Sequence, residues 1–501
     1  MALAIVHSRA AFGIEAPLVT VEVHLSAGLP NFAIVGMPET AVRESRERVR
    51  SAILNSQLDF PQQRITINLA PADLPKSGGR FDLAIAIGIL AASGQIEVAQ
   101  LRGRVFVGEV ALSGDVRRVG GLLPGLLASF REGHTSVVPS ENNAEAALLP
   151  DADIRLCSHL LEVVQGLRGE RELAKPQALP QPTLPLHPDF HDVIGQEAAK
   201  RALLIAAAGA HNVLLRGPPG TGKTMLASRL PGILPPLQQA QALEVAAIHS
   251  LVQQQVTQGD WHTPPLRAPH HTASAVALAG GGSLLQPGEI SLAHHGVLFL
   301  DELPEFSPRA LEVLREPLEA GQIQISRAKF KVRMPGQIQL IATMNLCPCG
   351  RLGADDQGCS CPPEKIRQYQ QRISGPLLDR IDLQVQVNRL SEQEKQALLQ
   401  RQAASEVLSS HQLRAKVIAC REFQCQRSGK ANAHLTQEEM KEVCALSKSD
   451  ARLLNDAITK LKLSTRAFFR VLKIARTIAD LQEATAISTP HLLEAINYRR
   501  G

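Results

Sequence analysis

An eight-residue stretch near the middle of the chain constrains the fold more than any other feature. It matches the pattern G-x-x-x-x-G-K-[ST], follows an apolar run at 213–215 and precedes a helical pattern at 225–230. In such a strand–loop–helix unit, backbone N–H groups and a helix N-terminus surround bound phosphates, the lysine reaches the β- and γ-phosphates, and the threonine binds Mg²⁺. The sequence therefore predicts an α/β domain that binds ATP with Mg²⁺. The residues of this phosphate loop are Gly217, Pro218, Pro219, Gly220, Thr221, Gly222, Lys223 and Thr224.

Two carboxylates follow a short apolar run farther along the chain. Val297–Leu300 is continuously apolar, as expected of a buried parallel strand, and Asp301 and Glu302 come directly after it. Alone, such a pair could equally cap a helix. Beside a complete phosphate loop it predicts that Asp301 helps to hold Mg²⁺ and that Glu302 orients or deprotonates the attacking water. The pairing favours ATP hydrolysis over nucleotide binding without turnover.

Length and proline distribution predict several domains. The 501 residues exceed the roughly 250–300 residues at which single cores stop growing. Five prolines between 176 and 188 favour an extended linker. Before the linker, 1–175 has mixed α/β patterns. After it, alternating strand and helix patterns at 189–385 predict a parallel sheet flanked by helices, and 386–501 has helical patterns throughout.

Composition limits the partners and the compartment. The chain has 53 basic and 48 acidic residues, a net charge of +5, which tolerates a polyanionic partner without requiring one. Aromatic residues make up only 3%, which argues against a platform that grips single strands by base stacking. Neither an export signal nor an apolar run of about 18 residues is evident, so we expect a cytoplasmic protein with no membrane segment.

Four cysteines lie within the fifteen residues 347–361. Four thiolates could close a tetrahedral Zn²⁺ site and so fold a polar loop. The C-x-C spacing is tighter than the usual C-x₂₋₄-C, and the alternative is four free thiols in an exposed loop. We predict zinc as a further cofactor. The residues are Cys347, Cys349, Cys359 and Cys361.

Four cations alternate over a short segment: Arg327, Lys329, Lys331 and Arg333. Side chains two apart share one face of a β-strand, so the alternation predicts a basic edge that contacts DNA phosphates or, alternatively, solvent. If Arg327 lies at a turn, the alternation holds only from Lys329 onward.

Several longer strings resemble one family. The string FHDVIGQE at 190–197 resembles the adenine-side box of AAA+ ATPases, and RAPHHTAS at 267–274, GEISLAHHG at 288–296 and SGPLLDRID at 374–382 resemble their magnesium-chelatase-like branch. Over essentially its full length the chain resembles the ComM/YifB family of bacterial DNA-processing ATPases. That resemblance implies a Lon-protease-like α/β domain at the N-terminus, a central AAA+ domain and a C-terminal helical lid.

The resemblance also implies roles for single residues around the nucleotide. Val193 and Ile194 would border the adenine base, and Asn345 would sense the γ-phosphate or the attacking water. It further implies a hairpin at the alternating cations, where such ATPases often project into the pore of a ring.

Two arginines resemble residues that act on nucleotides in AAA+ assemblies. Arg380 resembles the arginine finger, with Arg372 as a competing candidate, and Arg466 resembles the sensor of the lid domain. A finger that neutralises charge on a neighbour's nucleotide requires a ring or a filament of subunits.

The first 175 residues resemble the proteolytic domain of Lon without its catalytic pair. Strings at 75–80 and 108–122 carry the likeness, but Arg80 stands where Lon has its nucleophilic serine and Leu123 where it has its lysine. An arginine cannot attack a carbonyl and a leucine cannot accept a proton. We therefore expect a scaffold or docking module with no peptidase activity.

Taken with the resemblance, these features predict a hexameric ATPase that translocates on DNA and drives branch migration of recombination intermediates in natural transformation. Two alternatives stay open. One is a motor that inserts Mg²⁺ into a porphyrin, and the other is an ATP-dependent unfoldase or protease.

Overall fold

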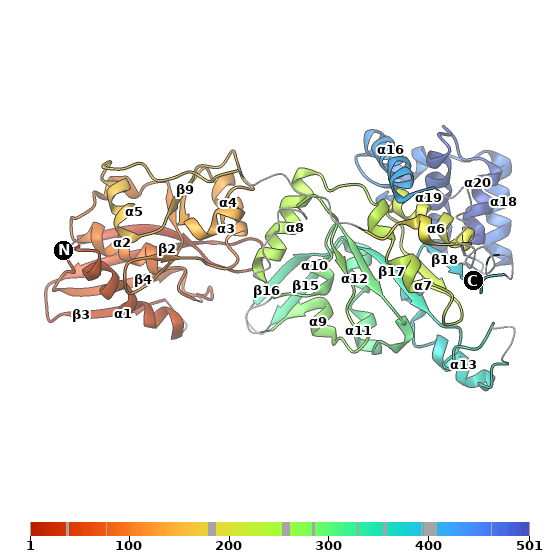
Figure 1. The fold of residues 1–501 in the computed structure, drawn as a ribbon, viewed down its shortest axis with the longest axis horizontal. Coiled ribbons are helices and arrows are strands. Elements are labelled where there is room, and N and C mark those ends of the chain that lie inside the picture. The colour runs from red at the N-terminus through yellow and green to blue at the C-terminus, as the bar shows by residue number, and fades with distance from the viewer. Residues whose placement is uncertain are drawn as a thin grey trace. The chain divides into compact units, whose positions relative to one another are not determined.

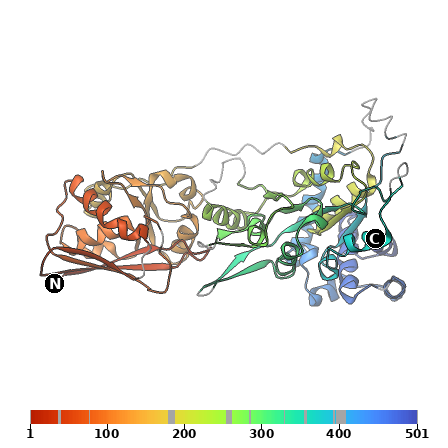
Figure 2. The same cartoon turned by 90° about the horizontal axis from the view of Figure 1, so that it is seen from below.

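The computed structural model describes residues 2–36, 40–76, 78–178, 187–252, 261–282, 286–327, 330–353, 358–391, 394, 408–461 and 463–499 (Figures 1 and 2). The chain forms two compact units. Unit 1 contains residues 1–183, 240–261 and 282–287, and unit 2 contains 184–239, 262–281 and 288–501. The boundary between 183 and 184 falls inside the stretch predicted as a linker.

Unit 1 is built on a mixed seven-stranded sheet of order β3-β4-β2-β1-β5-β8-β9. The strands β1 to β2 and β2 to β4 pair antiparallel, and the other neighbours are parallel. Strand β2 alternates between buried and half-buried residues, as its apolar/polar sequence predicts. The strands of unit 1 are β1 Ala2–Arg9, β2 Leu18–Ser26, β3 Asn31–Val35, β4 Arg64–Ala70, β5 Arg104–Phe106, β6 Glu109–Val110, β7 Val116–Arg117, β8 Thr135–Pro139, β9 Ile154–Cys157 and β13 Gln286–Pro287.

One helix of unit 1, α8, comes from the sequence after the phosphate loop. Helix α2 is buried over its whole length, because Ala, Ile and Leu cover all its faces. Helix α8 follows the phosphate loop in the chain, yet its buried alanines join the same hydrophobic cluster as β5, β8 and α3. This placement differs from the expectation that 189–385 forms one domain. The helices are α1 Thr40–Asn55, α2 Asp82–Ala92, α3 Leu123–Arg131, α4 Asn143–Ala146, α5 Leu160–Leu167 and α8 Gln239–Leu251, with 3₁₀ turns at Val98–Leu101 and Ser140–Asn142.

Unit 2 contains the predicted parallel sheet, in the order β11-β14-β17-β10-β18. All four neighbouring pairs are parallel. Strands β14 and β17 are buried at every residue, as expected of central parallel strands: β14 is continuously apolar, and β17 is apolar except at Gln339 and Thr343. The carboxyl ends of β10, β14 and β17 therefore meet at one edge of the sheet. The strands of unit 2 are β10 Val213–Arg216, β11 Leu266–Arg267, β12 Gly280–Gly281, β14 Val297–Leu300, β15 Gln322–Arg327, β16 Phe330–Pro335, β17 Gln339–Met344 and β18 Leu383–Gln386.

The C-terminal helices share one hydrophobic core with α6 and the parallel sheet, so the predicted helical lid belongs to unit 2. Within the described part of the chain, no helix is long and apolar enough to cross a membrane. The helices of unit 2 are α6 Glu197–Gly209, α7 Lys223–Ala227, α9 Ala275–Ala279, α10 Glu289–Leu292, α11 Pro308–Glu312, α12 Arg315–Ala320, α13 Pro363–Gln370, α14 Gly375–Leu378, α16 Ser410–Ser428, α17 Gln437–Val443, α18 Lys448–Lys460, α19 Thr465–Leu481 and α20 Thr489–Asn497, with 3₁₀ turns at Phe190–Asp192, Leu230–Ile233, Leu303–Glu305 and Asn432–His434.

Strands β15 and β16 form an antiparallel hairpin that extends from the body of unit 2 (Figure 2). Side chains at 322–325 and 331–334 alternate between a buried apolar face, which includes Ile323 and Val332, and an exposed polar face. Arg327 ends β15 and pairs with Phe330, so it stands beside the turn and on the other strand from Lys331 and Arg333. The alternation of cations is therefore interrupted at the turn.

Candidate active site

The phosphate loop leads from β10 into α7 as the motif predicts. Gly222 has φ 84°, a left-handed conformation that favours glycine, and Lys223 begins the helix. Burial lowers the pKa of Lys223. Its Nζ donates hydrogen bonds to the carbonyl oxygens of Gly217 at 2.8 Å and Pro218 at 2.7 Å, and to Oδ1 of Asn345 at 3.1 Å. The ammonium therefore lies where the loop meets the end of β17.

The segment predicted to border the adenine base lies beside the same loop. Val193 is buried and Ile194 half-buried. Two residues on, Gln196 Nε2 donates to the carbonyl of Asn388 at 2.6 Å and reaches that of Thr221 at 3.5 Å. The longer contact joins this segment to the phosphate loop, and the shorter bond joins it to the residues after β18. The sequence alone did not single out Gln196, which is only one residue of the string at 190–197.

The acidic pair meets the threonine of the loop. Thr224 Oγ1 lies 3.1 Å and 3.3 Å from the two carboxylate oxygens of Asp301. Neighbouring oxygen ligands of an octahedral Mg²⁺ lie about 2.9 Å apart, so these donors fit adjacent positions on one ion. Glu302 has φ 52° and ψ 54°, a left-handed conformation uncommon for glutamate, which turns the chain out of β14.

No motif marks Thr343, a buried residue of β17 whose hydroxyl contacts both Asp301 and the backbone N–H of Glu302. Its signal in the sequence is its position two residues before Asn345 on an apolar strand. The structure thus brings together Lys223, Thr224, the acidic pair and Asn345 at one sheet edge.

Arg380 and Arg466 lie at the opposite end of this sheet. Arg380 precedes β18, whose parallel neighbour β10 separates it from the phosphate loop by about 13 Å of strand. Arg380 forms a close ion pair with Glu319 of α12, and Arg466 lies 3.6 Å from the same carboxylate. The hydrogen bond from Arg380 lowers the pKa of Glu319. Neither arginine is directed to the phosphate loop of its own chain.

Arg372, the other candidate for the arginine finger, lies beside the turn that follows the acidic pair. It donates to the carbonyl of Pro304 at 3.2 Å and pairs with Glu305 at 3.4 Å, just after the acidic pair. It does not join the cluster at Glu319.

A basic cavity of about 680 Å³ surrounds that cluster. Asp382, on its wall, forms a close ion pair with Arg470 and accepts a hydrogen bond from the backbone N–H of Asn212 at 2.9 Å. The cavity has more cations than anions and so suits an anionic group. Its cationic residues are Arg380, Lys430, Arg466, Arg470 and Lys473.

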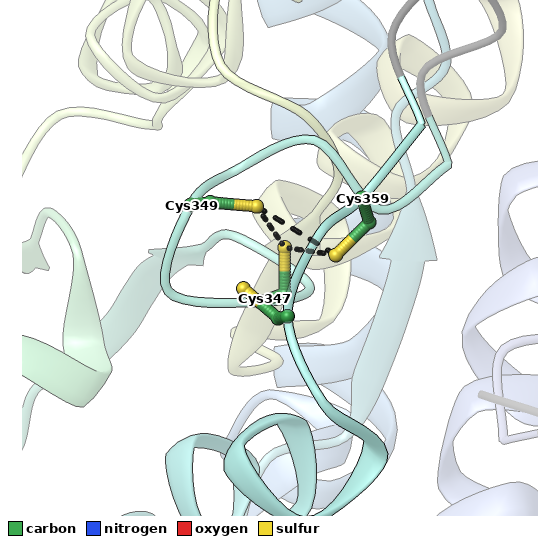
Figure 3. Close-up of side chains that lie close together, drawn as sticks. Cys347, Cys349 and Cys359 are labelled. Atoms are coloured by element: carbon green, nitrogen blue, oxygen red, sulfur yellow. Dashed lines mark hydrogen bonds between the residues drawn. The ribbon is translucent and has the colours of Figure 1, made fainter.

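The four cysteines of the loop after Asn345 converge, and Figure 3 shows three of them, Cys347, Cys349 and Cys359. Cys347 Sγ lies 3.3 Å from that of Cys349 and 3.5 Å from that of Cys359, and all four sulfur atoms, including that of Cys361, lie within 4.8 Å of one another. A tetrahedral zinc with Zn–S of about 2.3 Å places its sulfur ligands about 3.8 Å apart. A hydrogen bond from the backbone N–H of Arg351 lowers the pKa of Cys349 to about 6. The donor set and its spacing fit zinc.

The cysteine loop touches the phosphate loop. Gly350, between two of the cysteine positions, has φ 76°, and a Cβ added to it would lie 3.0 Å from Cδ and Cγ of Pro219. The cysteine cluster and the nucleotide site are therefore packed against each other.

Unit 1 lacks the groups of a serine–lysine peptidase at the two positions that the resemblance points to. Arg80 is buried and donates to the carbonyl oxygens of Gly120, Gly121 and Arg9, and burial lowers its pKa to about 10. Leu123 is buried in an apolar cluster. Ser77 lies outside the described residues.

Helix α8, itself part of unit 1, contacts the segment that contains Gly121 and Leu123. Ser250 accepts hydrogen bonds from the N–H of Gly121 through its carbonyl at 3.0 Å and from that of Leu123 through its hydroxyl at 3.4 Å. The hydroxyl donates to Glu145 at 2.6 Å. Asn142 donates to the second oxygen of Glu145 at 2.7 Å. A segment of the ATPase region is thus fixed in unit 1 by a buried polar network.

Of the predicted basic segment, Lys331 and Arg333 are exposed on the polar face of the hairpin. Lys329 and the side chain of Arg327 lie outside the described residues.

The sheet order and the placement of these groups define the class. A phosphate loop after β10, two acidic residues after β14 and a polar residue after β17, with a helical domain following the sheet, are the arrangement of an AAA+ ATPase. Family models agree. "Magnesium chelatase, subunit ChlI" matches residues 189–395, "Subunit ChlI of Mg-chelatase" matches 21–143, and "Magnesium chelatase, subunit ChlI C-terminal" matches 407–499.

Relatives that match the whole chain identify its family within this class. Competence protein ComM of Haemophilus influenzae is 49% identical, with 100% of this chain and 98% of the relative covered. YifB of Salmonella typhimurium is 50% identical, with 100% and 97% covered. The magnesium-chelatase 38 kDa subunit of Rhodobacter capsulatus is 26% identical over 34% of this chain and 53% of its own length. The chain belongs to the ComM/YifB family of magnesium-chelatase-like AAA+ proteins.

Proposed function

We propose that this chain is one subunit of a hexameric ring that uses ATP hydrolysis to move along DNA and to drive branch migration of recombination intermediates. One observation supports a ring: Arg380 and Arg466 pair with Glu319, away from the phosphate loop of the same chain. In a ring, this end of one subunit can face the nucleotide of the next.

Each group at the nucleotide has a role that its geometry supports. Lys223 and the loop N–H groups hold the phosphates, and Thr224 and Asp301 would hold Mg²⁺, which supplies charge neutralisation when bound. Glu302 orients or deprotonates the attacking water, and Asn345, bonded to Lys223, contacts the γ-phosphate or that water.

Mixed rings test whether Arg380 acts on a neighbour. Arg380→Ala subunits keep an intact phosphate loop, whereas Glu302→Gln subunits keep an intact arginine. If the arginine acts between subunits, mixing the two inactive variants restores part of the ATP turnover. Turnover that stays at the sum of the separate variants would contradict the ring mechanism. Retained ATP binding by Arg380→Ala is the control for folding.

Two observations support DNA as the polymer along which the motor moves. The hairpin presents Lys331 and Arg333 on an exposed polar face, and a relative matched over its full length is named a competence protein. Cations on such a face contact phosphates without reading bases, which suits a motor that acts on any sequence. We propose natural transformation as the setting, and the cytoplasm as the location.

The cysteine cluster and unit 1 have supporting roles in this proposal. Zinc at the four cysteines stabilises a loop that otherwise has few apolar residues. Unit 1 acts as a scaffold in which the Ser250–Glu145 network fixes α8.

The family-model descriptions favour a second candidate, a motor that serves metal insertion into a porphyrin. Stimulation of ATP turnover by a porphyrin with Mg²⁺, and not by branched DNA, would support that candidate instead.

A further inference from the structure

Thr343 lies between the two acidic residues and touches both. It is 1% exposed on β17, next to the end of β14 in the parallel register that pairs Leu300 with Ala342. Its Oγ1 forms a short hydrogen bond with Oδ1 of Asp301 and lies 3.0 Å from the backbone nitrogen of Glu302.

The direction of both hydrogen bonds follows from the chemistry of the groups. An ionised carboxylate only accepts and a backbone N–H only donates. The hydroxyl of Thr343 therefore donates its proton to Asp301 and accepts from the N–H of Glu302. One side chain satisfies a charged acceptor and a backbone donor at once.

These two bonds fix different parts of the site. The bond to Asp301 orients the carboxylate that also meets Thr224 at 3.1 Å, so it sets the position of a Mg²⁺ ligand. The bond to Glu302 holds a residue whose backbone is left-handed, at φ 52°, and such a conformation persists only where its surroundings determine it.

We infer that Thr343 is the positioning residue of the ATPase site: it couples the Mg²⁺-binding carboxylate of Asp301 to the backbone that aims Glu302 at the attacking water. Because Thr343 is buried, it would act through Asp301 and Glu302. This inference rests on the proposed ATP hydrolysis and adds to it a residue that links two catalytic functions.

The test compares Thr343→Val, which keeps the shape and loses the hydroxyl, with Thr343→Ser, which keeps the hydroxyl. We expect Thr343→Val to lower kcat by about 10-fold or more and to raise the Mg²⁺ concentration for half-maximal rate, and Thr343→Ser to stay within about 3-fold of wild type. Thr459→Val, at an exposed position of α18, is the matched control.

Two further measurements separate positioning from misfolding. A fluorescent ATP analogue in EDTA should bind Thr343→Val as it binds wild type, because Lys223 and the loop are unchanged. Mn²⁺ binding to the ADP complex, followed by electron paramagnetic resonance, should weaken in Thr343→Val and not in Thr343→Ser.

Unchanged Mn²⁺ affinity together with unchanged kcat in Thr343→Val would overturn the inference, as would equal losses in the valine and serine variants. If wild type itself hydrolyses no ATP, the proposed function fails, whereas the Mn²⁺ comparison still tests Thr343.

Discussion

Replacing Gly350 by alanine tests whether the cysteine loop supports the nucleotide site. At φ 76° an alanine costs about 1–2 kcal/mol, because its Cβ crowds the backbone. The new Cβ would also lie 3.0 Å from the ring of Pro219, closer than ordinary van der Waals contact. Pro219 belongs to the phosphate loop, so relief of this contact must move one loop against the other.

The expected effect on nucleotide binding follows from those numbers. If about 1 kcal/mol of the strain is relieved by displacing Pro219, the affinity for ATP falls about 5-fold. Equilibrium titration with a fluorescent ATP analogue, with and without Mg²⁺, measures this change directly.

Substitutions at two other glycines separate the effect of the Pro219 contact from the effect of backbone strain. Gly358, also in the cysteine loop, has no left-handed φ, and among the described residues no heavy atom would lie within 4 Å of a Cβ at this position, so Gly358→Ala should leave ATP affinity unchanged. Gly429 has φ 69° and likewise no described neighbour within 4 Å of an added Cβ, so Gly429→Ala should cost stability without changing ATP affinity. Wild-type affinity in Gly350→Ala, or an equal loss in all three variants, would show that the cysteine loop does not support the nucleotide site.

Three other predictions concern stability, DNA and metal. Burial alone would raise the pKa of Asp382, but the Arg470 guanidinium holds this pKa well below its usual range. The stabilisation is therefore present above the ordinary pKa of about 3.9 and is lost as the pH falls through the lower folded value. Asp382→Asn should thus destabilise unit 2 by about 3–5 kcal/mol at pH 7 in chemical denaturation, and the difference should shrink below pH 4. Changing Lys331 and Arg333 together to Ala should weaken DNA binding and reduce the slope of log K against log salt by about 1 per cation, measured by fluorescence anisotropy. The purified protein should contain about one zinc per chain by mass spectrometry of metals, and Cys347→Ser should lose it.

Matched controls keep these predictions specific. Gln324→Ala, opposite Arg333 on the same hairpin face, should leave the salt slope unchanged. Cys425→Ser, outside the cluster, should keep the metal. A salt slope equal to that of wild type in the double hairpin variant would remove the hairpin from the DNA interface, and metal-free wild type would contradict the zinc site.

Short-range patterns made the nucleotide site predictable. The phosphate loop needs glycines, a lysine and a threonine at fixed spacing, and the acidic pair must follow a strand, so Lys223, Asp301 and the parallel sheet are visible in local sequence. The sensor role of Asn345 follows only from family resemblance; the structure places its side chain beside Lys223.

Contacts between distant segments were not predictable in this way. Glu319 meets Arg380 and Arg466 because residues of α12, the segment before β18 and the start of α19 line one cavity, which no local pattern encodes. The packing of Gly350 on Pro219 and the membership of α8 in unit 1 also depend on tertiary packing. Thr343 looks like an ordinary strand residue until its two partners are seen beside it.

Stimulation of ATP turnover by branched DNA distinguishes a DNA motor from an ATPase with another partner. Turnover is measured with and without four-way and forked DNA, together with strand exchange on the same junctions, for wild type and Glu302→Gln. We predict that branched DNA stimulates wild-type turnover and that strand exchange requires it, whereas Glu302→Gln binds ATP and does neither. Wild-type turnover that is indifferent to every DNA structure, or strand exchange that persists in Glu302→Gln, would contradict the account.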